Sequence, residues 1–359
     1  MRWPESYVKR RPTVASAITA MAGGYAGILI ARMLLGAAEA PSFPLNSKAV
    51  GHWFPRSERG TATAMFDGMA KFSQVVGVPL VAVALVGFGW RGAFWMTSIL
   101  SFAFLIVFWK GYRDPSEDEQ LSSNEYEYIM AGGAAREGRS DNSSSAMLGY
   151  VLSRRRVWGL TLGFACYGYS NSMFSSWLPT YFVQTQNVGI LTSASFTMLP
   201  WFIATTAQFV VAGWLVDWLI GRGHDETLVR KSIIILCLMF GLAVIGAAFT
   251  RDIFWVLFWM TVSVSALTSA STIGWSFPSL VAPRGGSATV GSIMNTANAA
   301  MGSVSAIVTG SIVQITGSFS DAFMVAACVL VAGVCFYAFL MGPIEPVPDM
   351  PDGAAVPAQ

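Results

Sequence analysis

The chain has 359 residues, of which 54% are hydrophobic and 12% are charged, and its mean hydropathy is +0.54. This composition is too apolar and too poor in charge for a soluble domain of that length. The formal net charge of +2 is too small to indicate a nucleic-acid-binding protein. The sequence therefore predicts a protein that is surrounded largely by lipid.

Long stretches with almost no charge recur along the chain, and each reaches roughly the 20 residues that a helix needs to cross about 30 Å of hydrocarbon. A shorter apolar stub, about residues 13–22, precedes them and is too short to span a membrane alone. We predict an all-α polytopic membrane protein with nine spans, at residues 24–47, 61–87, 90–110, 157–183, 192–216, 231–250, 253–282, 287–315 and 320–341.

A long polar stretch, about residues 111–156, divides the chain after the third full span. It is acidic at first and ends in the triplet Arg154, Arg155 and Arg156. Many transporters consist of two related helical halves around a midplane site. We therefore predict a remnant of an N-terminal helix bundle at 1–110, a central loop at 111–156, a six-helix C-terminal bundle at 157–341 and a tail at 342–359.

The lysines and arginines outside the spans sort onto alternating loops. Only Arg91 and Arg251 fall on one side, and all the others fall on the side of the central loop and the tail. Because cytoplasmic loops hold the excess of basic residues, we predict that the central loop and the C-terminus are cytoplasmic. The basic group from Lys9 to Arg11 joins this side only if a complete helix separates it from the span at 24–47, so the pattern predicts that part of a helix is missing there.

Neither a metal site nor a disulfide framework is predicted. The only histidines, His52 and His224, lie in loops, and no metal-site spacing accompanies them. No nucleophile, base and orienting group stand at a recognisable spacing either, so a membrane enzyme is the least favoured class. We predict no metal, no cofactor and no catalytic residue. The cysteines all fall inside predicted spans, at Cys166, Cys237, Cys328 and Cys335.

Glu39 is a carboxylate inside a predicted span. Such residues generally face a cavity or a partner and mark ion or proton pathways. Pro41 and Pro44 remove backbone donors nearby and free carbonyls upstream, which opens the helix close to the acid. The alternative is a structural ion pair with Arg32, which lies two turns away on the same face. Arg32 is also close enough to a helix end to extend its side chain to the headgroups.

Asp67 and Lys71 lie four residues apart on the next span. They share one surface of the helix and can neutralise each other, which is the structural interpretation. In the functional interpretation Lys71 faces a cavity and holds a substrate carboxylate, while Asp67 tunes its charge. The sequence leaves both interpretations open.

Six motifs along the chain are specific to one protein family when they are taken together, although each motif alone is a weak signal. They read RMLLGAAEAPSFP from Arg32, NSKAVGHWFPRSERGTATAMFDGMAKF from Asn46, GWRGAF from Gly89, YGYSNSMFSSWLPTYF from Tyr167, GWLVD from Gly213 and IGWSFPSLVAP from Ile273. These motifs, with the helix that holds Asn295 and Asn298, resemble the anion:cation symporter family of the major facilitator superfamily (MFS), which includes hexuronate, galactonate and glucarate transporters. The resemblance covers nearly all of the chain after about residue 14.

The resemblance implies an MFS fold that lacks helices 1 and 2 and most of helix 3. It also implies proton-coupled import of a small organic anion by alternating access, with a sugar acid or another carboxylate as the substrate. The expected partners are that anion, a proton and the lipid bilayer, and the expected state is a monomer in the inner (cytoplasmic) membrane. The alternative is a non-transporting fragment, or a start codon placed too late in the gene of such a transporter.

The resemblance also assigns roles to particular residues. Glu39 is implied to couple protons, and the implied substrate-binding residues are Arg32, Lys71, Thr272, Trp275, Asn295 and Asn298. For the last four of these, helix packing is the alternative role. Galactonate-type members have glutamine where this chain has Ala70, so we expect a changed substrate contact there. A conformational latch in two cytoplasmic loops is implied for Arg56, Glu58, Arg59, Gly213, Asp217 and Arg222. Trp218 stands where the family has a basic residue, which predicts a weaker latch.

Overall fold

The computed structural model describes residues 18–39, 42, 46, 49–50, 53–55, 58–111, 121–132, 144–250, 252–283, 285–345 and 347–349. Every regular element within these residues is a helix, which confirms the predicted all-α class. The chain forms two compact units. The first comprises residues 1–57 and 77–137, and the second comprises residues 58–76 and 138–359.

The first unit contains α2 (Gly24–Glu39), the later part of α4 (Arg59–Gly111) and the short helix α5 (Ser123–Ala131). Gly89 interrupts α4 with φ 69° and ψ −179°, a backbone conformation that glycine adopts far more readily than other residues. The element is therefore two helices joined at Gly89, which matches the predicted spans at 61–87 and 90–110. The predicted span at 24–47 is described as a continuous helix only as far as Glu39.

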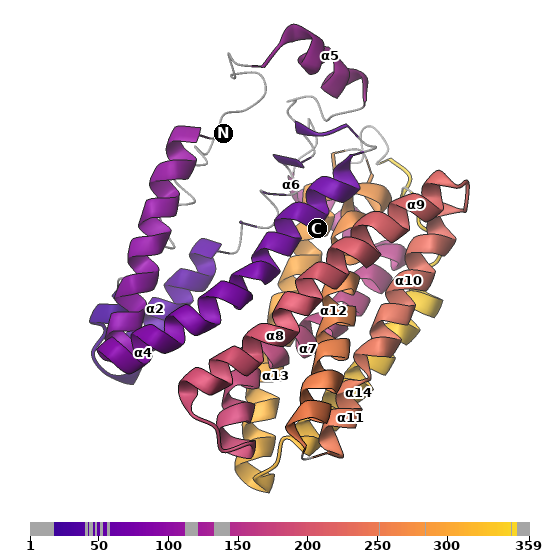
Figure 1. Cartoon of the computed structure of the whole chain (residues 1–359). Helices are drawn as coiled ribbons and strands as arrows, with labels where there is room; N and C mark the ends of the chain where they lie inside the picture. Colours follow the sequence, from indigo (N-terminus) through magenta and orange to yellow (C-terminus); the bar gives the residue numbers. More distant parts are fainter. Residues whose placement is uncertain are drawn as a thin grey trace, which may run out of the picture. The chain divides into compact units, whose positions relative to one another are not determined.

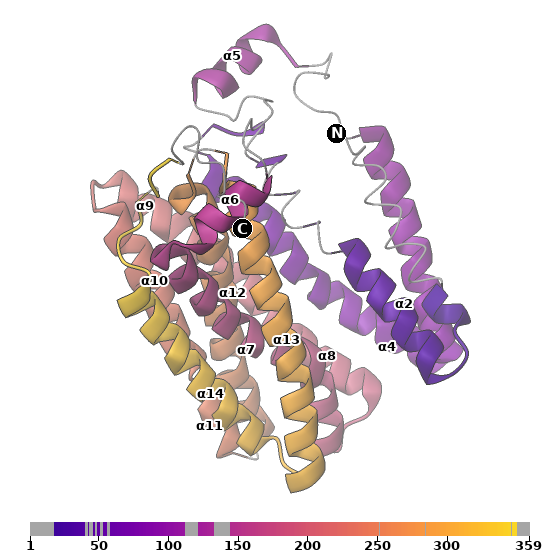
Figure 2. The ribbon, with the colours of Figure 1, turned by 180° about the vertical axis from the view of Figure 1, so that it is seen from behind.

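The second unit is a bundle that α7 (Arg155–Thr185) and α12 (Ile253–Val281) organise (Figure 1). These two helices have long runs of buried residues. Helix α7 packs along α13 (Ser287–Thr316) and α14 (Ser320–Cys335), and α12 packs against α8 (Ile190–Gln208) and α10 (Glu226–Gly241), as Figure 2 shows from behind. The remaining elements are α6 (Ser144–Leu152), the π-helix η1 (Phe209–Leu215), α9 (Val216–Gly221), α11 (Val244–Ala248) and the π-helix η2 (Phe336–Leu340).

Six helical stretches among the described residues are long and apolar enough to cross a membrane. They are Thr61–Phe108, Ile190–Gly221, Glu226–Ala248, Ile253–Val281, Ser287–Thr316 and Ser320–Leu340. Helix α7 is of similar length, but it begins with two arginines and holds three tyrosines, more than any of these stretches. Because α7 is extensively buried in the bundle, its polar side chains face protein rather than lipid.

Polar side chains satisfy the helix ends of the second unit. The Asp252 carboxylate caps α12 by accepting from the backbone amide of Phe254 at 2.9 Å. Where α10 ends, the Ser263 hydroxyl of α12 donates to the Gly241 carbonyl at 2.6 Å. In apolar surroundings an unpaired backbone group is costly, so these side chains allow the helices to break inside the bundle.

Glycines on α7 bring neighbouring helices close to its backbone. A methyl group on Gly163 would lie 2.6 Å from the Tyr337 ring of η2, and one on Gly168 would overlap the side-chain oxygen of Asn298 on α13. One turn further along, the Ser172 hydroxyl donates to the Gly302 carbonyl of α13 at 3.1 Å. Small residues of this kind allow the close packing that is usual between membrane helices.

Residues Gly342–Glu345 and Val347–Asp349, which we call the C-terminal strap, cross one end of this bundle without helical structure. Ile344 and Val347 of the strap are buried. Its polar contacts include Val347 N to Val281 O at 2.8 Å, Tyr150 Oη to Pro348 O at 2.7 Å, and the Arg156 guanidinium to the Glu345 carboxylate at 3.3 Å. The strap therefore fastens α6, α7 and α12 together. Residues 350–359 of the predicted tail lie outside the described residues.

Candidate functional site

Lys71, on the first part of α4, is held by a tyrosine of α7. Its Nζ donates to the Tyr167 hydroxyl at 3.1 Å and lies 5.8 Å from the centre of the same ring. Lys71 makes no ion pair within 4 Å with any described residue. Its direct contacts in this structure are thus a hydroxyl oxygen and an aromatic face, and the charge of Asp67 acts on it without a direct ion pair.

Asp67 is one turn before Lys71 and is completely buried. Its carboxylate accepts from the Thr272 hydroxyl at 2.9 Å and from the Ser271 hydroxyl at 3.4 Å, both on α12. The two charged side chains therefore contact different helices and do not form the direct intrahelical pair that was one interpretation of their spacing. Ser271 is a contact that the sequence reasoning missed, since α12 is rich in hydroxyls and nothing in their pattern distinguishes this one.

The next residue of α4, Gly68, lies against the junction of α8 and η1. A methyl group on Gly68 would lie 2.6 Å from the Phe209 ring and 3.3 Å from Nε2 of Gln208. Gln208 is fully buried, and neither its amide nitrogen nor its amide oxygen has a hydrogen-bond partner. A π-helix begins directly after Gln208, and such irregular turns are common at functional positions. The sequence reasoning missed Gln208 because it lies within an apolar span.

Three aromatic residues connect Lys71 to α12. The Tyr167 ring lies 4.9 Å from the Phe164 ring, and Phe164 meets the edge of Trp275 at 5.4 Å between ring centres. Trp275 is buried and stands three residues after Thr272, the partner of Asp67. Helices α4, α7 and α12 therefore place Lys71 and Asp67 at the two ends of one connected cluster that includes the predicted residues Thr272 and Trp275.

The predicted asparagines lie on α13. Asn298 abuts Gly168, the residue directly after Tyr167, and its side-chain oxygen is buried without a hydrogen-bond partner. Asn295 lies nearly one turn earlier on α13 and is partly buried. The structure thus brings Asn298 to the α7 backbone beside the cluster.

Glu39 and Arg32 belong to the other compact unit. Glu39 is the last residue of α2, and the Arg32 guanidinium lies 4.9 Å from the centre of the Phe94 ring. Pro41 and Pro44, which we expect to open the helix near the acid, lie outside the described residues. The proton-coupling role of Glu39 therefore stays a prediction.

Three of the predicted latch residues, Gly213, Asp217 and Arg222, lie along the segment from η1 to the end of α9. Asp217 lies near Thr61 of α4 and Arg230 of α10, Arg222 stacks on the Trp218 ring at 3.8 Å, and Gly213 lies within η1. Glu58 is exposed at the start of α4. Arg56 and the side chain of Arg59 lie outside the described residues.

Arg230 is a further residue at this end that the sequence reasoning missed. It donates to the Glu226 carboxylate at 2.8 Å and to the Ser276 hydroxyl of α12 at 3.1 Å. The Arg230 side chain is only 11% exposed, whereas that of Glu226 is 45% exposed, so only the arginine of this pair is shielded from solvent. The spacing of four residues between Glu226 and Arg230 is a pattern that can be recognised in a sequence.

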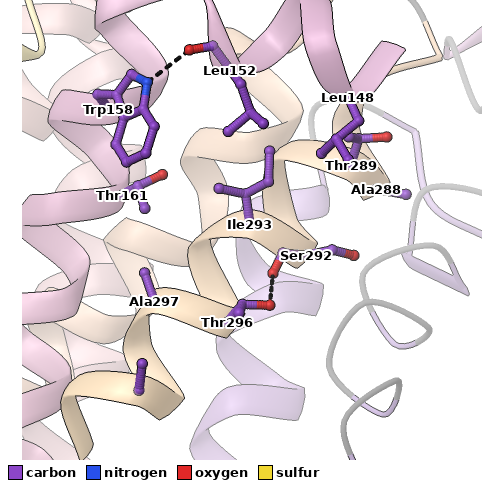
Figure 3. A pocket seen from close by; sticks show the side chains of 11 residues that line it. Leu148, Leu152, Trp158, Thr161, Ala288, Thr289, Ser292, Ile293, Thr296 and Ala297 are labelled. Atoms are coloured by element: carbon purple, nitrogen blue, oxygen red, sulfur yellow. Dashed lines mark hydrogen bonds between the residues drawn. The ribbon is translucent and has the colours of Figure 1, made fainter. Parts of the chain in front are cut away.

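A pocket of about 630 Å³ lies apart from this cluster, between α6, α7 and α13 (Figure 3). The Trp158 indole at its upper edge donates to the Leu152 carbonyl at 2.7 Å, and Thr296 donates to the Ser292 carbonyl at 2.8 Å. Among the residues that the structure describes, no charged side chain and none of the predicted substrate residues line this pocket. Its chemistry therefore does not suit an anion.

Comparison with known proteins identifies the family. The family model described as Major Facilitator Superfamily matches residues 9–306. The chain belongs to the major facilitator superfamily. An uncharacterized transporter of Bacillus subtilis, YybO, is 36% identical to this MFS chain over 315 residues, which cover 88% of the chain and 72% of YybO. The probable galactarate/D-glucarate transporter GarP of Escherichia coli K12 is 30% identical over 88% of the chain and 72% of GarP.

The solved structures that resemble this MFS chain show the same fold. A bacterial homologue of the human lysosomal transporter Spinster superposes with a TM-score of 0.60 at 14% identity, over 93% of this chain and 81% of that one. The Escherichia coli fucose:proton symporter FucP superposes with a TM-score of 0.57 at 15% identity, over 93% and 82% of the two chains. The predicted MFS fold and the non-enzymatic transporter class are confirmed.

Proposed function

We propose that this MFS protein is a secondary active transporter that imports a small organic anion together with protons by alternating access. The observation that carries the proposal is Lys71, a cation inside an apolar helix that is held by the neutral hydroxyl of Tyr167 at 3.1 Å. A substrate carboxylate would supply the direct ion-pair partner that Lys71 lacks among the described residues. The relatives named as galactarate/D-glucarate and D-galactonate transporters favour a sugar acid, such as a hexonate, hexuronate or aldarate, over other carboxylates.

The other proposed residues would act around the ion pair between Lys71 and the substrate carboxylate. Trp275 would offer a flat face to the carbon chain, and the asparagine amides would offer donors and an acceptor to its hydroxyls. Protonation of Glu39 would accompany substrate binding. The full proposed set for the substrate is Arg32, Lys71, Thr272, Trp275, Asn295 and Asn298, and the proposed latch is Arg56, Glu58, Arg59, Gly213, Asp217 and Arg222.

We further propose that the protein acts as a monomer in the inner membrane, with the central loop and the C-terminus in the cytoplasm. The positions of the basic residues support this orientation. The lipid bilayer and the anion would be its partners.

Uptake into proteoliposomes tests the proposal. The protein is reconstituted and supplied with labelled D-glucarate, galactarate or D-galactonate under an imposed inward proton gradient. We expect at least one of these anions to accumulate against its gradient in the wild type, and Glu39→Gln to lower that accumulation while substrate exchange continues. Asp252→Asn is the matched control, because asparagine caps α12 as well as aspartate does.

The outcomes separate the parts of the proposal. If the wild type takes up none of these anions, the assigned substrate class is wrong. Accumulation by Glu39→Gln that equals the wild-type level would remove the coupling role of Glu39 and leave anion transport intact.

A further inference from the structure

The proposed function leaves one acid inside an apolar helix without a role. Asp67 lies in the stretch Thr61–Phe108, which is long and apolar enough to cross a membrane, and its side chain is completely buried. An ionised carboxylate at such a place is expensive unless it is paired and hydrogen-bonded. The groups around Asp67 therefore determine whether its carboxylate is ionised or protonated.

Each element packed around Asp67 contributes a defined group. Helix α12 supplies only the neutral hydroxyls of Ser271 and Thr272, and α8 supplies the Gln208 amide beside Gly68. The titratable groups are Lys71, one turn along the same helix, and its partner Tyr167 on α7. Among the described residues Lys71 is therefore the cation that offsets the charge of Asp67.

The charge of this site changes when an anion binds. The positive charge of Lys71 balances the negative charge of Asp67, although the two groups contact different helices. A substrate carboxylate that displaces the Tyr167 hydroxyl from Lys71 adds a second negative charge to a buried volume. Since an unbalanced buried charge is costly, the site regains neutrality if one carboxylate is protonated.

We propose that Asp67 takes up a proton when an anionic substrate binds Lys71, so that Asp67 and Glu39 together carry two protons for each anion. This inference rests on the proposed anion transport. The proton from the outer solution forms an O–H bond with the Asp67 carboxylate. It returns to the inner solution after the anion has left Lys71 and the negative charge of Asp67 is balanced again.

The hydroxyls of α12 suit both forms of Asp67. As the structure shows, Thr272 and Ser271 donate to the carboxylate. A hydroxyl can also rotate and accept a hydrogen bond, so a protonated Asp67 could donate to Thr272 without a change of partner. Asp67 therefore keeps a hydrogen bond in both its ionised and its protonated form. A reversible proton site in apolar surroundings requires such a bond in both forms.

Steady-state accumulation in proteoliposomes counts the protons. With the membrane potential held at zero by potassium and valinomycin, the accumulation of labelled D-glucarate or D-galactonate rises about tenfold per pH unit for each proton carried. We expect a slope of about two decades per pH unit for the wild type, and about one decade for Asp67→Asn, with substrate exchange retained. The control Asp252→Asn should keep the wild-type slope.

The results distinguish a failure of the Asp67 role from a failure of the proposed function. A slope in Asp67→Asn equal to that of the wild type would overturn the role of Asp67, whereas no uptake by the wild type would overturn the proposed function itself. If Asp67→Asn does not fold, Glu39→Gln decides instead. A remaining slope of about one decade in Glu39→Gln supports Asp67 as the second proton site, and the absence of any slope overturns it.

Discussion

Removal of the hydrogen bond between Lys71 and Tyr167 should change the affinity of the protein for its substrate anion in a direction that the structure predicts. The Tyr167 hydroxyl accepts from the ammonium group of Lys71 at 3.1 Å, and the substrate carboxylate in the proposed mechanism must displace it. Replacement of Tyr167 by phenylalanine keeps the aromatic ring, which lies 5.8 Å from the ammonium nitrogen, and removes only the hydroxyl. We therefore expect Tyr167→Phe to bind the anion more tightly than the wild type.

The size of the effect follows from the kind of bond that is lost. A hydrogen bond to a charged group contributes about 1.5–3 kcal/mol net, and about 1.4 kcal/mol corresponds to a tenfold change in affinity. Lys71 is only partly buried, so water can replace part of the lost bond, and the lower end of this range applies. The expected gain in apparent affinity for D-galactonate or D-glucarate is about tenfold.

Concentration-dependent uptake at a fixed proton gradient measures this change. Tyr169→Phe is the matched control, because Tyr169 is also a buried tyrosine of α7 but its hydroxyl lies beside Thr309 of α13. Its apparent affinity should equal that of the wild type. Weaker binding by Tyr167→Phe would refute the reasoning, since it would show that the hydroxyl contacts the substrate and does not compete with it.

Two further predictions concern the packing of the C-terminal helices. Gly168→Ala should lower the unfolding temperature in detergent by several degrees, because the added methyl group would overlap the side chain of Asn298 and lie 2.9 Å from its backbone carbonyl. Gly149→Ala has open space around the new methyl group and should leave that temperature unchanged. Ser263→Ala removes the donor to the Gly241 carbonyl and should lower the free energy of unfolding by about 1 kcal/mol, measured by denaturant titration; an unchanged value would mean that water satisfies this carbonyl.

The helix boundaries could be predicted because lipid imposes a strong constraint on composition. The predicted span at 253–282 corresponds to α12, Ile253–Val281, and that at 287–315 corresponds to α13, Ser287–Thr316. The gap between the spans at 61–87 and 90–110 coincides with Gly89, the residue that interrupts α4. An uninterrupted apolar stretch must form its hydrogen bonds internally, so composition and length suffice to locate it.

The partners of the charged residues could not be predicted in the same way. The spacing of Asp67 and Lys71 places both on one surface of α4, but it does not say which helices face that surface. The structure assigns α12 to Asp67 and α7 to Lys71. Gln208 gave no signal at all, because a single amide in an apolar span resembles the small polar residues that commonly join membrane helices.

The predictions about missing helices and about the roles of all the predicted site residues stay predictions. The DNA upstream of Met1 tests the first. An in-frame extension that encodes two apolar spans would favour a start codon placed too late, and stop codons or a frameshift would favour a gene remnant.

The C-terminal strap has a consequence for how the bundle of α7 to α14 can move. Alternating access by rocking requires each bundle to turn as a solid body, and helices that are joined only by lipid-embedded contacts can slide along one another. The strap bonds the loop-side ends of α6, α7 and α12 to a single short segment outside the helices. In the proposed alternating access, these contacts would resist the sliding of the three helix ends along one another and would confine the motion to the boundaries of this bundle.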